Sequence, residues 1–234
     1  MIKLRIKTSY QNFRLSKNNV VEYHFPNSYN IFMNYLESGL NAYFSESQLQ
    51  KIRACRIGVA GAGGLGSNIA MLLVRCGFVH FYILDFDLVE EKNLNRQFFF
   101  PSDVGKPKVE ALSGHLLQIN PGLKIRVQTV PWPEASRAFN PDPFFSCDIL
   151  FEAFDRPETK AHFVDHYCDK VPYLISGNGM AGIAGPEITS RRHANVFFVG
   201  DATSEAEKLP PLAPRVMICA AKMADIALRL VLNF

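Results

Sequence analysis

The chain has 234 residues, of which 48% are hydrophobic and 20% are charged, and its formal net charge is +3. Such a chain can bury a full core, and its small charge argues against nucleic acid or an anionic membrane as the main partner. No apolar run reaches the roughly 18 residues of a membrane-spanning helix, and the first residues lack a signal-peptide core. We therefore expect a cytoplasmic protein without membrane contact.

Residues 1–50 are predicted to form a small N-terminal appendage. Ile2–Lys7 alternates apolar and charged residues, as a half-buried strand does, and Val20–Phe25 is a second candidate strand. Tyr29–Ser45 has the apolar spacing of an amphipathic helix, and a serine-capped short helix follows that ends near Lys51. This strand–strand–helix order fits a degenerate β-grasp fragment, or an arm that packs on the main domain or on a partner chain.

Residues 51–234 are predicted to form one α/β domain. Buried strands alternate with amphipathic helices, which is typical of a Rossmann-like, mostly parallel sheet with helices on both faces. The later, glycine-rich part favours antiparallel strands. The predicted strands are Arg56–Ala60, His80–Leu84, Lys124–Val130, Asp148–Ala153, Pro172–Ser176, Glu187–Ser190 and Asn195–Val199, and the predicted helices are Ser67–Gly77, Lys108–Ile119, Thr159–Cys168 and Arg215–Asn233.

A glycine-rich loop joins the first of these strands to the first helix. Gly61, Gly63, Gly64 and Gly66 allow a sharp turn and a close approach of the backbone to a phosphate, which the helix N-terminus also favours. Asp85 ends the next strand, where a carboxylate can accept hydrogen bonds from ribose hydroxyls. This order of elements predicts a nucleotide site: strand, glycine loop, helix, strand and acidic residue.

Charged side chains follow the same strand ends. Arg96 and Lys108 suit the phosphates of a triphosphate, and Asp155 suits a magnesium ion. An NAD-dependent dehydrogenase, the alternative use of such a loop, leaves these three residues without a common purpose. Each also has an ordinary structural explanation: Lys108 as a solvated first-turn residue, Arg96 as a surface residue or an ion-pair partner of Asp85 or Asp87, and Asp155 as a helix cap.

At these residues the sequence resembles the ATP-dependent adenylyltransferases related to ThiF, MoeB, HesA and the ubiquitin-activating enzymes, and is closest to the short ThiF type. The resemblance covers roughly residues 53–185, and its most specific part is the asparagine–arginine–glutamine block. The residues that carry it are Gly61–Gly66, Asp85–Asp87, Asn93–Gln97, Gly105–Glu110, Ile119–Pro121 and Glu152–Asp155.

The resemblance implies that MgATP activates the C-terminal glycine of a ThiS-like β-grasp sulfur carrier, for thiamine or related sulfur-transfer biosynthesis, with release of pyrophosphate. It implies catalytic roles for Arg96, Lys108 and Asp155, with Asp155 binding magnesium. The implied nucleotide-binding residues are Gly61, Gly63, Gly64, Gly66, Asp85, Asp87, Asn93, Asn95, Arg96, Gln97, Lys108 and Asp155. Other acyl substrates remain open: a molybdopterin-type carrier, or the substrate of a tRNA threonylcarbamoyladenosine dehydratase. A nucleotide-binding scaffold without turnover is also open.

The cysteines set this chain apart from the longer relatives. Those relatives hold zinc with two C-x-x-C pairs, whereas the five cysteines here are widely spaced, so we expect free thiols and no zinc site. The region at 191–211, where some relatives carry a reactive cysteine, has none, which leaves Cys219 as a less direct candidate. Relatives also form homodimers in which the partner supplies an arginine; Arg14 and Arg53 are candidates without a matching motif.

Overall fold

The computed structural model describes residues 13–15, 20–23, 34–134, 142–205 and 208–234. The strand predicted at Ile2–Lys7 lies outside these residues, as does the first part of the helix predicted at Tyr29–Ser45. The division of the chain near residue 50 stays a prediction.

The described strands form one sheet of nine, in the order β1-β2-β5-β4-β3-β6-β7-β9-β8. In this order, the six neighbouring strands β5-β4-β3-β6-β7-β9 are parallel, and antiparallel strands lie at both edges of the sheet. This confirms the Rossmann-like, mostly parallel sheet and its late antiparallel strand. The strands are β1 Phe13–Leu15, β2 Val20–Tyr23, β3 Arg56–Ala60, β4 His80–Leu84, β5 Lys124–Gln128, β6 Ile149–Glu152, β7 Tyr173–Gly177, β8 Thr189–His193 and β9 Val196–Gly200.

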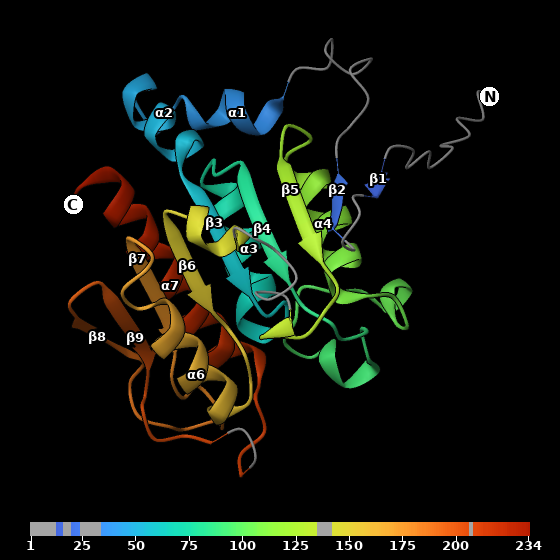
Figure 1. Ribbon diagram of the computed structural model, residues 1–234, viewed down its shortest axis with the longest axis vertical. Coiled ribbons are helices and arrows are strands. Elements are labelled where there is room, and N and C mark those ends of the chain that lie inside the picture. Colours follow the sequence, from blue (N-terminus) through green and yellow to red (C-terminus); the bar gives the residue numbers. More distant parts are fainter. Residues whose placement is uncertain (1–12, 16–19, 24–33, 135–141, 206–207) are drawn as a thin grey trace.

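Helices cover both faces of the sheet, with α6 on one face and α3, α4 and α7 on the other (Figure 1). Side chains alternate along the central strands, so that Ile83 of β4 joins the core beneath α3 and α7 while Tyr82 joins the aromatic core beneath α6. The helices are α1 Tyr35–Leu40, α2 Glu46–Ala54, α3 Gly64–Arg75, α4 Lys108–Ile119, α6 Pro157–Tyr167 and α7 Ala213–Leu232. Short 3₁₀ helices occupy Glu91–Asn93, Pro101–Asp103 and Pro143–Ser146.

The N-terminal elements are continuous with the main sheet and its helices. β2 pairs antiparallel with β5, and β1 pairs with β2. Helix α2 begins with the predicted serine cap, in which Ser45 and Gln48 exchange hydrogen bonds with each other's backbone N–H. Leu49 and Ile52 of α2 are fully buried, and the helix packs against α7.

Several predicted boundaries were wrong. The helix predicted to reach Ser45 ends at Leu40, the strand predicted to reach Val130 ends at Gln128, and the helix predicted from Arg215 begins at Ala213. The helix predicted from Ser67 begins at Gly64, so half of the glycine motif is helical. The helix predicted from Thr159 begins at Pro157, a residue type that suits the first helical position. The strand predicted at Glu187–Ser190 lies at Thr189–His193, where all five residues are exposed. Within the described residues, no helix combines the length and apolar character needed to cross a membrane.

Candidate active site

The glycine loop makes a turn that only glycine permits at two positions. Gly61 has a φ of +98°, and a Cβ there would lie 2.7 Å from the backbone oxygen of Ala153 in the neighbouring strand connection. A Cβ on Gly66 would lie 1.8 Å from the backbone oxygen of Gly61. The turn therefore folds back on the first residues of α3. No side chain among the described residues caps this helix, which leaves its N-terminus to an anion.

Asp85 holds the glycine loop from the neighbouring strand. Its carboxylate accepts the backbone N–H of Ala62 at 2.6 Å and the backbone N–H of Asp87 at 2.8 Å, and the residue is 8% exposed. Burial raises the pKa of Asp85 above its ordinary value, although Lys108 and the two N–H donors act in the opposite direction. The carboxylate thus has fewer donors than its burial calls for.

Lys108 pairs with Asp87 across the irregular segment that follows β4. Its Nζ lies 2.7 Å from Oδ2 of Asp87, and its backbone N–H donates to the backbone oxygen of the same residue at 2.9 Å. The lysine side chain is 7% exposed and that of Asp87 46%. The solvated first-turn explanation for Lys108 is therefore wrong. Because an ammonium has three donors, Lys108 can keep this ion pair and still donate to a ligand.

Arg96 lies over the start of α3. Its Cγ is 3.7 Å from the position that a Cβ on Gly64 would take, and Nη1 donates to the backbone oxygen of Lys92 and to Oδ1 of Asn95. Burial lowers the pKa of Arg96, while the nearby charge of Asp155 raises it. Asp155 is thus near enough for its charge to act on Arg96, whereas the carboxylate that forms an ion pair with Lys108 is that of Asp87.

Asp155 follows β6 and is exposed. It does not cap α6, whose N-cap is Arg156 without a side-chain hydrogen bond, so the capping explanation is wrong. Hydrogen bonds to the fully buried Glu152 stabilise the turn that carries Asp155. The Glu152 carboxylate accepts the backbone N–H of Phe154 at 2.8 Å and Nζ of Lys160 at 2.9 Å. Ser176 donates to the other Glu152 oxygen at 2.6 Å.

The remaining predicted residues support the loop around Arg96. Asn93 is buried, and its Oδ1 accepts the backbone N–H of Glu90 at 3.0 Å, so it holds a local turn. Asn95 donates to the backbone oxygen of Pro211 at 3.2 Å. Gln97 is 8% exposed, and its Oε1 is buried without a hydrogen-bond partner among the described residues.

Two residues of α3 that the sequence analysis did not single out join the glycine loop to the Arg96 segment. Ser67 donates to the backbone oxygen of Gly63 and accepts the backbone N–H of Phe98 at 3.0 Å. Asn68 donates to the backbone oxygens of Gly64 and Arg96 at 2.6 and 2.9 Å. Both are polar residues on a predicted core-facing helix, a signal that could have marked them.

The site residues fit a nucleotide with magnesium. The uncapped start of α3 offers N–H groups, Arg96 offers a guanidinium beside it, and Gln97 presents an unpaired acceptor. Within the described residues, no three His, Cys, Asp or Glu side chains gather as a metal cluster. Magnesium suits one carboxylate combined with phosphate oxygens and water, so Asp155 is its candidate protein ligand.

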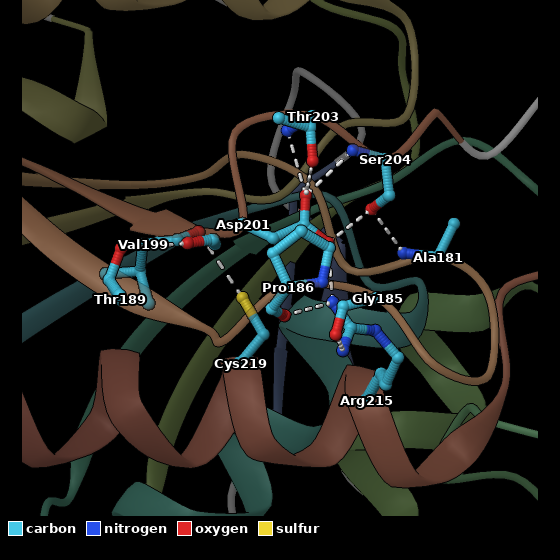
Figure 2. A network of polar contacts seen from close by, with 11 residues as sticks. Ala181, Gly185, Pro186, Thr189, Val199, Asp201, Thr203, Ser204, Arg215 and Cys219 are labelled. Atoms are coloured by element: carbon cyan, nitrogen blue, oxygen red, sulfur yellow. Dashed lines mark hydrogen bonds and ion pairs between the residues drawn. The ribbon is translucent and has the colours of Figure 1, made fainter.

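The cysteines do not offer a reactive thiol at this edge of the sheet. Cys219 is fully buried in α7 and donates to the backbone oxygen of Val199 at 3.4 Å (Figure 2). Burial raises the pKa of Cys219 to about 12, and it does the same for Cys55 and Cys147. A thiolate is therefore strongly disfavoured at Cys219.

A family model described as "ThiF family" matches residues 37–234. Ubiquitin-like modifier-activating enzyme 5 of Caenorhabditis elegans is 40% identical over 81 residues, 35% of this chain and 19% of that protein. SUMO-activating enzyme subunit 2 of Dictyostelium discoideum is 30% identical over 154 residues, 65% of this chain and 23% of that protein. The chain thus spans only about a fifth of the length of these curated relatives.

Solved structures show the same fold. The E. coli tRNA N6-threonylcarbamoyladenosine dehydratase TcdA, in complex with ATP, superposes with a TM-score of 0.72 at 21% identity, covering 84% of this chain and 93% of that one. E. coli MccB with ATP superposes with a TM-score of 0.62 at 21% identity, covering 88% of this chain and 65% of that one.

Proposed function

Because the chain belongs to the ThiF family, we propose that it uses ATP to adenylate the C-terminal glycine of a ThiS-like β-grasp sulfur carrier, releasing pyrophosphate. One observation carries the proposal: Arg96, on which the charge of the exposed Asp155 acts, lies against Gly64 at the start of an uncapped helix. A cation, a carboxylate that suits magnesium and free N–H donors near one another support the binding of a triphosphate.

The reaction needs no nucleophile from the protein. A carboxylate oxygen of the carrier attacks the α-phosphorus, an acyl–O–P bond forms, and the bond between the α-phosphorus and the bridging oxygen breaks. The electron pair leaves with pyrophosphate, and no proton has to move. The protein's task is to position the two reactants and to offset the charge that builds on the phosphates.

Each site residue has a role that follows from its place. The start of α3 and Arg96 bind phosphate oxygens, and Lys108 adds a charge from its pair with Asp87. Asp85 accepts ribose hydroxyls, which supply the donors that its burial calls for. Asp155 would hold magnesium, which supplies charge neutralisation when it is bound.

The product is proposed to be a free acyl-adenylate, since the buried Cys219 is unsuited to form a thioester. The relatives named ubiquitin-like modifier-activating and SUMO-activating enzymes favour a protein carrier as the acyl substrate. The likeness to TcdA keeps a second candidate, a carboxylate attached to tRNA, which the exposed Arg191 and Arg192 of β8 favour. A homodimer stays a prediction from the family resemblance.

ATP–pyrophosphate exchange with magnesium tests the proposal. We expect exchange only when a ThiS-like carrier ending in Gly-Gly is present, and a loss of about 100-fold or more in Arg96→Ala and Asp155→Ala, because each removes a charge that the transition state needs. The exposed Asp165→Ala on α6 is the matched control and should keep wild-type exchange.

Other outcomes would contradict the carrier proposal. Exchange that depends on a carboxylate-bearing tRNA, or on a molybdopterin-type carrier, would keep adenylation and replace the substrate. ATP binding without any exchange would indicate a scaffold. Binding of NAD in preference to ATP would indicate a dehydrogenase.

A further inference from the structure

A buried carboxylate with a full set of donors follows β9. Oδ1 of Asp201 accepts the backbone N–H groups of Thr203 and Ser204 at 2.9 and 2.8 Å, and the Thr203 hydroxyl at 3.3 Å. Oδ2 accepts the Ser204 hydroxyl at 2.7 Å and Nη2 of Arg215 at 2.5 Å (Figure 2). The Asp201 side chain is fully buried, so this ion pair is an internal part of the fold.

Arg215 extends the network from the first turn of α7 to the loop after β7. Nη1 donates to the backbone oxygen of Gly185 at 3.1 Å, and Nη2 donates to that of Pro186 at 2.9 Å. A Cβ on Gly185 would lie 2.7 Å from Nη2, so the guanidinium packs directly against the Gly185 backbone and leaves no room for a side chain there. The arginine side chain is 11% exposed.

A third link closes the same network. The Ser204 hydroxyl accepts the backbone N–H of Ala181 at 2.9 Å, and the backbone N–H of Asp201 donates to the oxygen of Gly179 at 3.0 Å. Asp201 and Arg215 therefore tie together three segments: the loop 178–186, the loop 201–204, and the start of α7. We refer to this ion pair with its hydrogen bonds as the Asp201–Arg215 clamp.

The clamp lies beside the proposed nucleotide site. In the sheet order β4-β3-β6-β7-β9, the nucleotide residues follow β4, β3 and β6, and the clamped loops follow the next two parallel strands at the same edge. Val216, next to Arg215, comes within 3.2 Å of the position of a Cβ on Gly64. The clamped segments thus border the start of α3, where the proposed nucleotide site begins.

We propose that Asp201 and Arg215 are positioning residues for the acyl substrate. By holding the loops 178–186 and 201–204, they fix a stretch of exposed backbone, with the exposed side chain of Ile183, along which an extended polypeptide tail can lie. Gly179 permits this close packing, because a Cβ there would overlap the Asp201 carboxylate. The inference rests on the proposed adenylation, and it assigns a role to two residues outside the nucleotide-binding set.

The kinetic test separates the acyl substrate from ATP. In pyrophosphate exchange with a ThiS-like carrier ending in Gly-Gly, Arg215→Met should raise the KM for the carrier about ten-fold or more and leave the KM for ATP within about two-fold, because only the acyl side loses its alignment. Arg215→Lys should recover part of the loss, since it keeps a charge opposite Asp201 but loses the two-pronged contact.

Two further variants separate loss of substrate positioning from loss of the fold. Ser204→Ala removes the link to Ala181 without leaving a buried charge and should raise the KM for the carrier to a smaller extent. Arg229→Met, which removes the exposed ion pair with Asp225 at 3.6 Å on the same helix, should leave both KM values unchanged. A folded Arg215→Met protein with an unchanged carrier KM, or with both KM values raised in parallel, would overturn the inference.

Hydrogen–deuterium exchange separates failure of the clamp from failure of the proposed function. Arg215→Met should increase amide exchange in 178–186 and 201–204 and leave α3 unchanged. If the wild-type protein catalyses no ATP–pyrophosphate exchange with the carrier, the proposed function fails. The amide exchange of the two loops still tests whether the Asp201–Arg215 clamp holds them. Unchanged protection of both loops in Arg215→Met would overturn it.

Discussion

Asp85 and Asp201 are both buried carboxylates that follow parallel strands, but the protein surrounds them differently. Burial would raise the pKa of Asp201, yet the hydrogen bonds from Ser204, Thr203 and Arg215 lower it to about 2. At Asp85, burial prevails over two backbone donors and the charge of Lys108, and the pKa is raised. A carboxylate with all its donors is part of the structure, and we infer that one that lacks donors can receive them from a ligand.

The same difference extends to the two halves of the sheet edge. Around the glycine loop, Asp155 is exposed and Arg96 is partly buried, so both can reach a ligand. Around β7 and β9, Asp201 and Arg215 pair with each other in the interior, although Nε of Arg215 has no hydrogen-bond partner among the described residues. We infer that charges of the first half act on the nucleotide and that charges of the second half maintain a shape.

The largest expected effect comes from breaking the close contact between Gly66 and the backbone of Gly61, on which the proposed nucleotide site depends. Gly66→Ala places a Cβ 1.8 Å from the backbone oxygen of Gly61, so the turn has to move. We expect the free energy of unfolding to fall by about 3 kcal/mol or more, with loss of ATP binding. Urea denaturation and calorimetry with ATP measure the two effects.

The control for this substitution is another helical glycine. A Cβ on Gly114 in α4 meets no atom within 4 Å, so Gly114→Ala should gain up to about 1 kcal/mol from helix propensity. Equal effects at the two positions would contradict a special role for the turn.

A smaller effect is expected from titrating Asp201, in the half of the sheet edge around β7 and β9. Because the folded-state pKa of Asp201 is lowered from 3.8 to about 2, its contribution to stability is full above the unfolded pKa and is lost as the pH falls through the folded value. The urea midpoint of the wild type should therefore exceed that of Asp201→Asn at about pH 5 and approach it near pH 2. A gap between the two proteins that does not change with pH would show that the charge of Asp201 is not the cause.

The smallest effect sharpens the comparison at Asp85. A raised pKa means that this carboxylate protonates before an ordinary one, and a protonated oxygen no longer accepts a ribose hydroxyl. Adenosine, which carries no phosphate to titrate, should therefore bind more weakly as the pH falls from neutrality towards the ordinary carboxyl pKa of 3.8, with a loss of at least about two-fold at that pH. Asp85→Asn should bind weakly at every pH. A wild-type affinity that stays constant over this range would contradict the ribose-binding role.

The sequence predicted the parallel sheet because its strands carry a signal that does not depend on distant residues. β3 and β4 were predicted to the residue, since each is a short apolar run that ends at a glycine or an aspartate. β8 was misplaced because its residues are all exposed and polar and have no apolar period. Helix α3 was predicted to begin too late, because glycine is a poor helix former and the close contact of Gly66 with Gly61 overrides that propensity.

The candidate site was predicted by residue type, and its pairings were not. The partner of Lys108 is Asp87, which depends on how the segment after β4 folds back onto α4. Asp201 belongs to no predicted helix or strand, yet it is buried because Arg215 reaches it from 14 residues later in the chain. The order aspartate, any residue, threonine, serine at 201–204 is typical of a turn closed by its own side chains and could have indicated this.

The exposed strand β8 has a consequence for the behaviour of the protein at high concentration. It is an edge strand whose backbone could add a strand from another molecule, and three of its five side chains are Arg191, Arg192 and His193. Basic residues on an edge repel a second copy of the same edge and discourage sheet-to-sheet aggregation. Replacing them with valine or threonine would raise the tendency of the protein to precipitate long before it changed the fold.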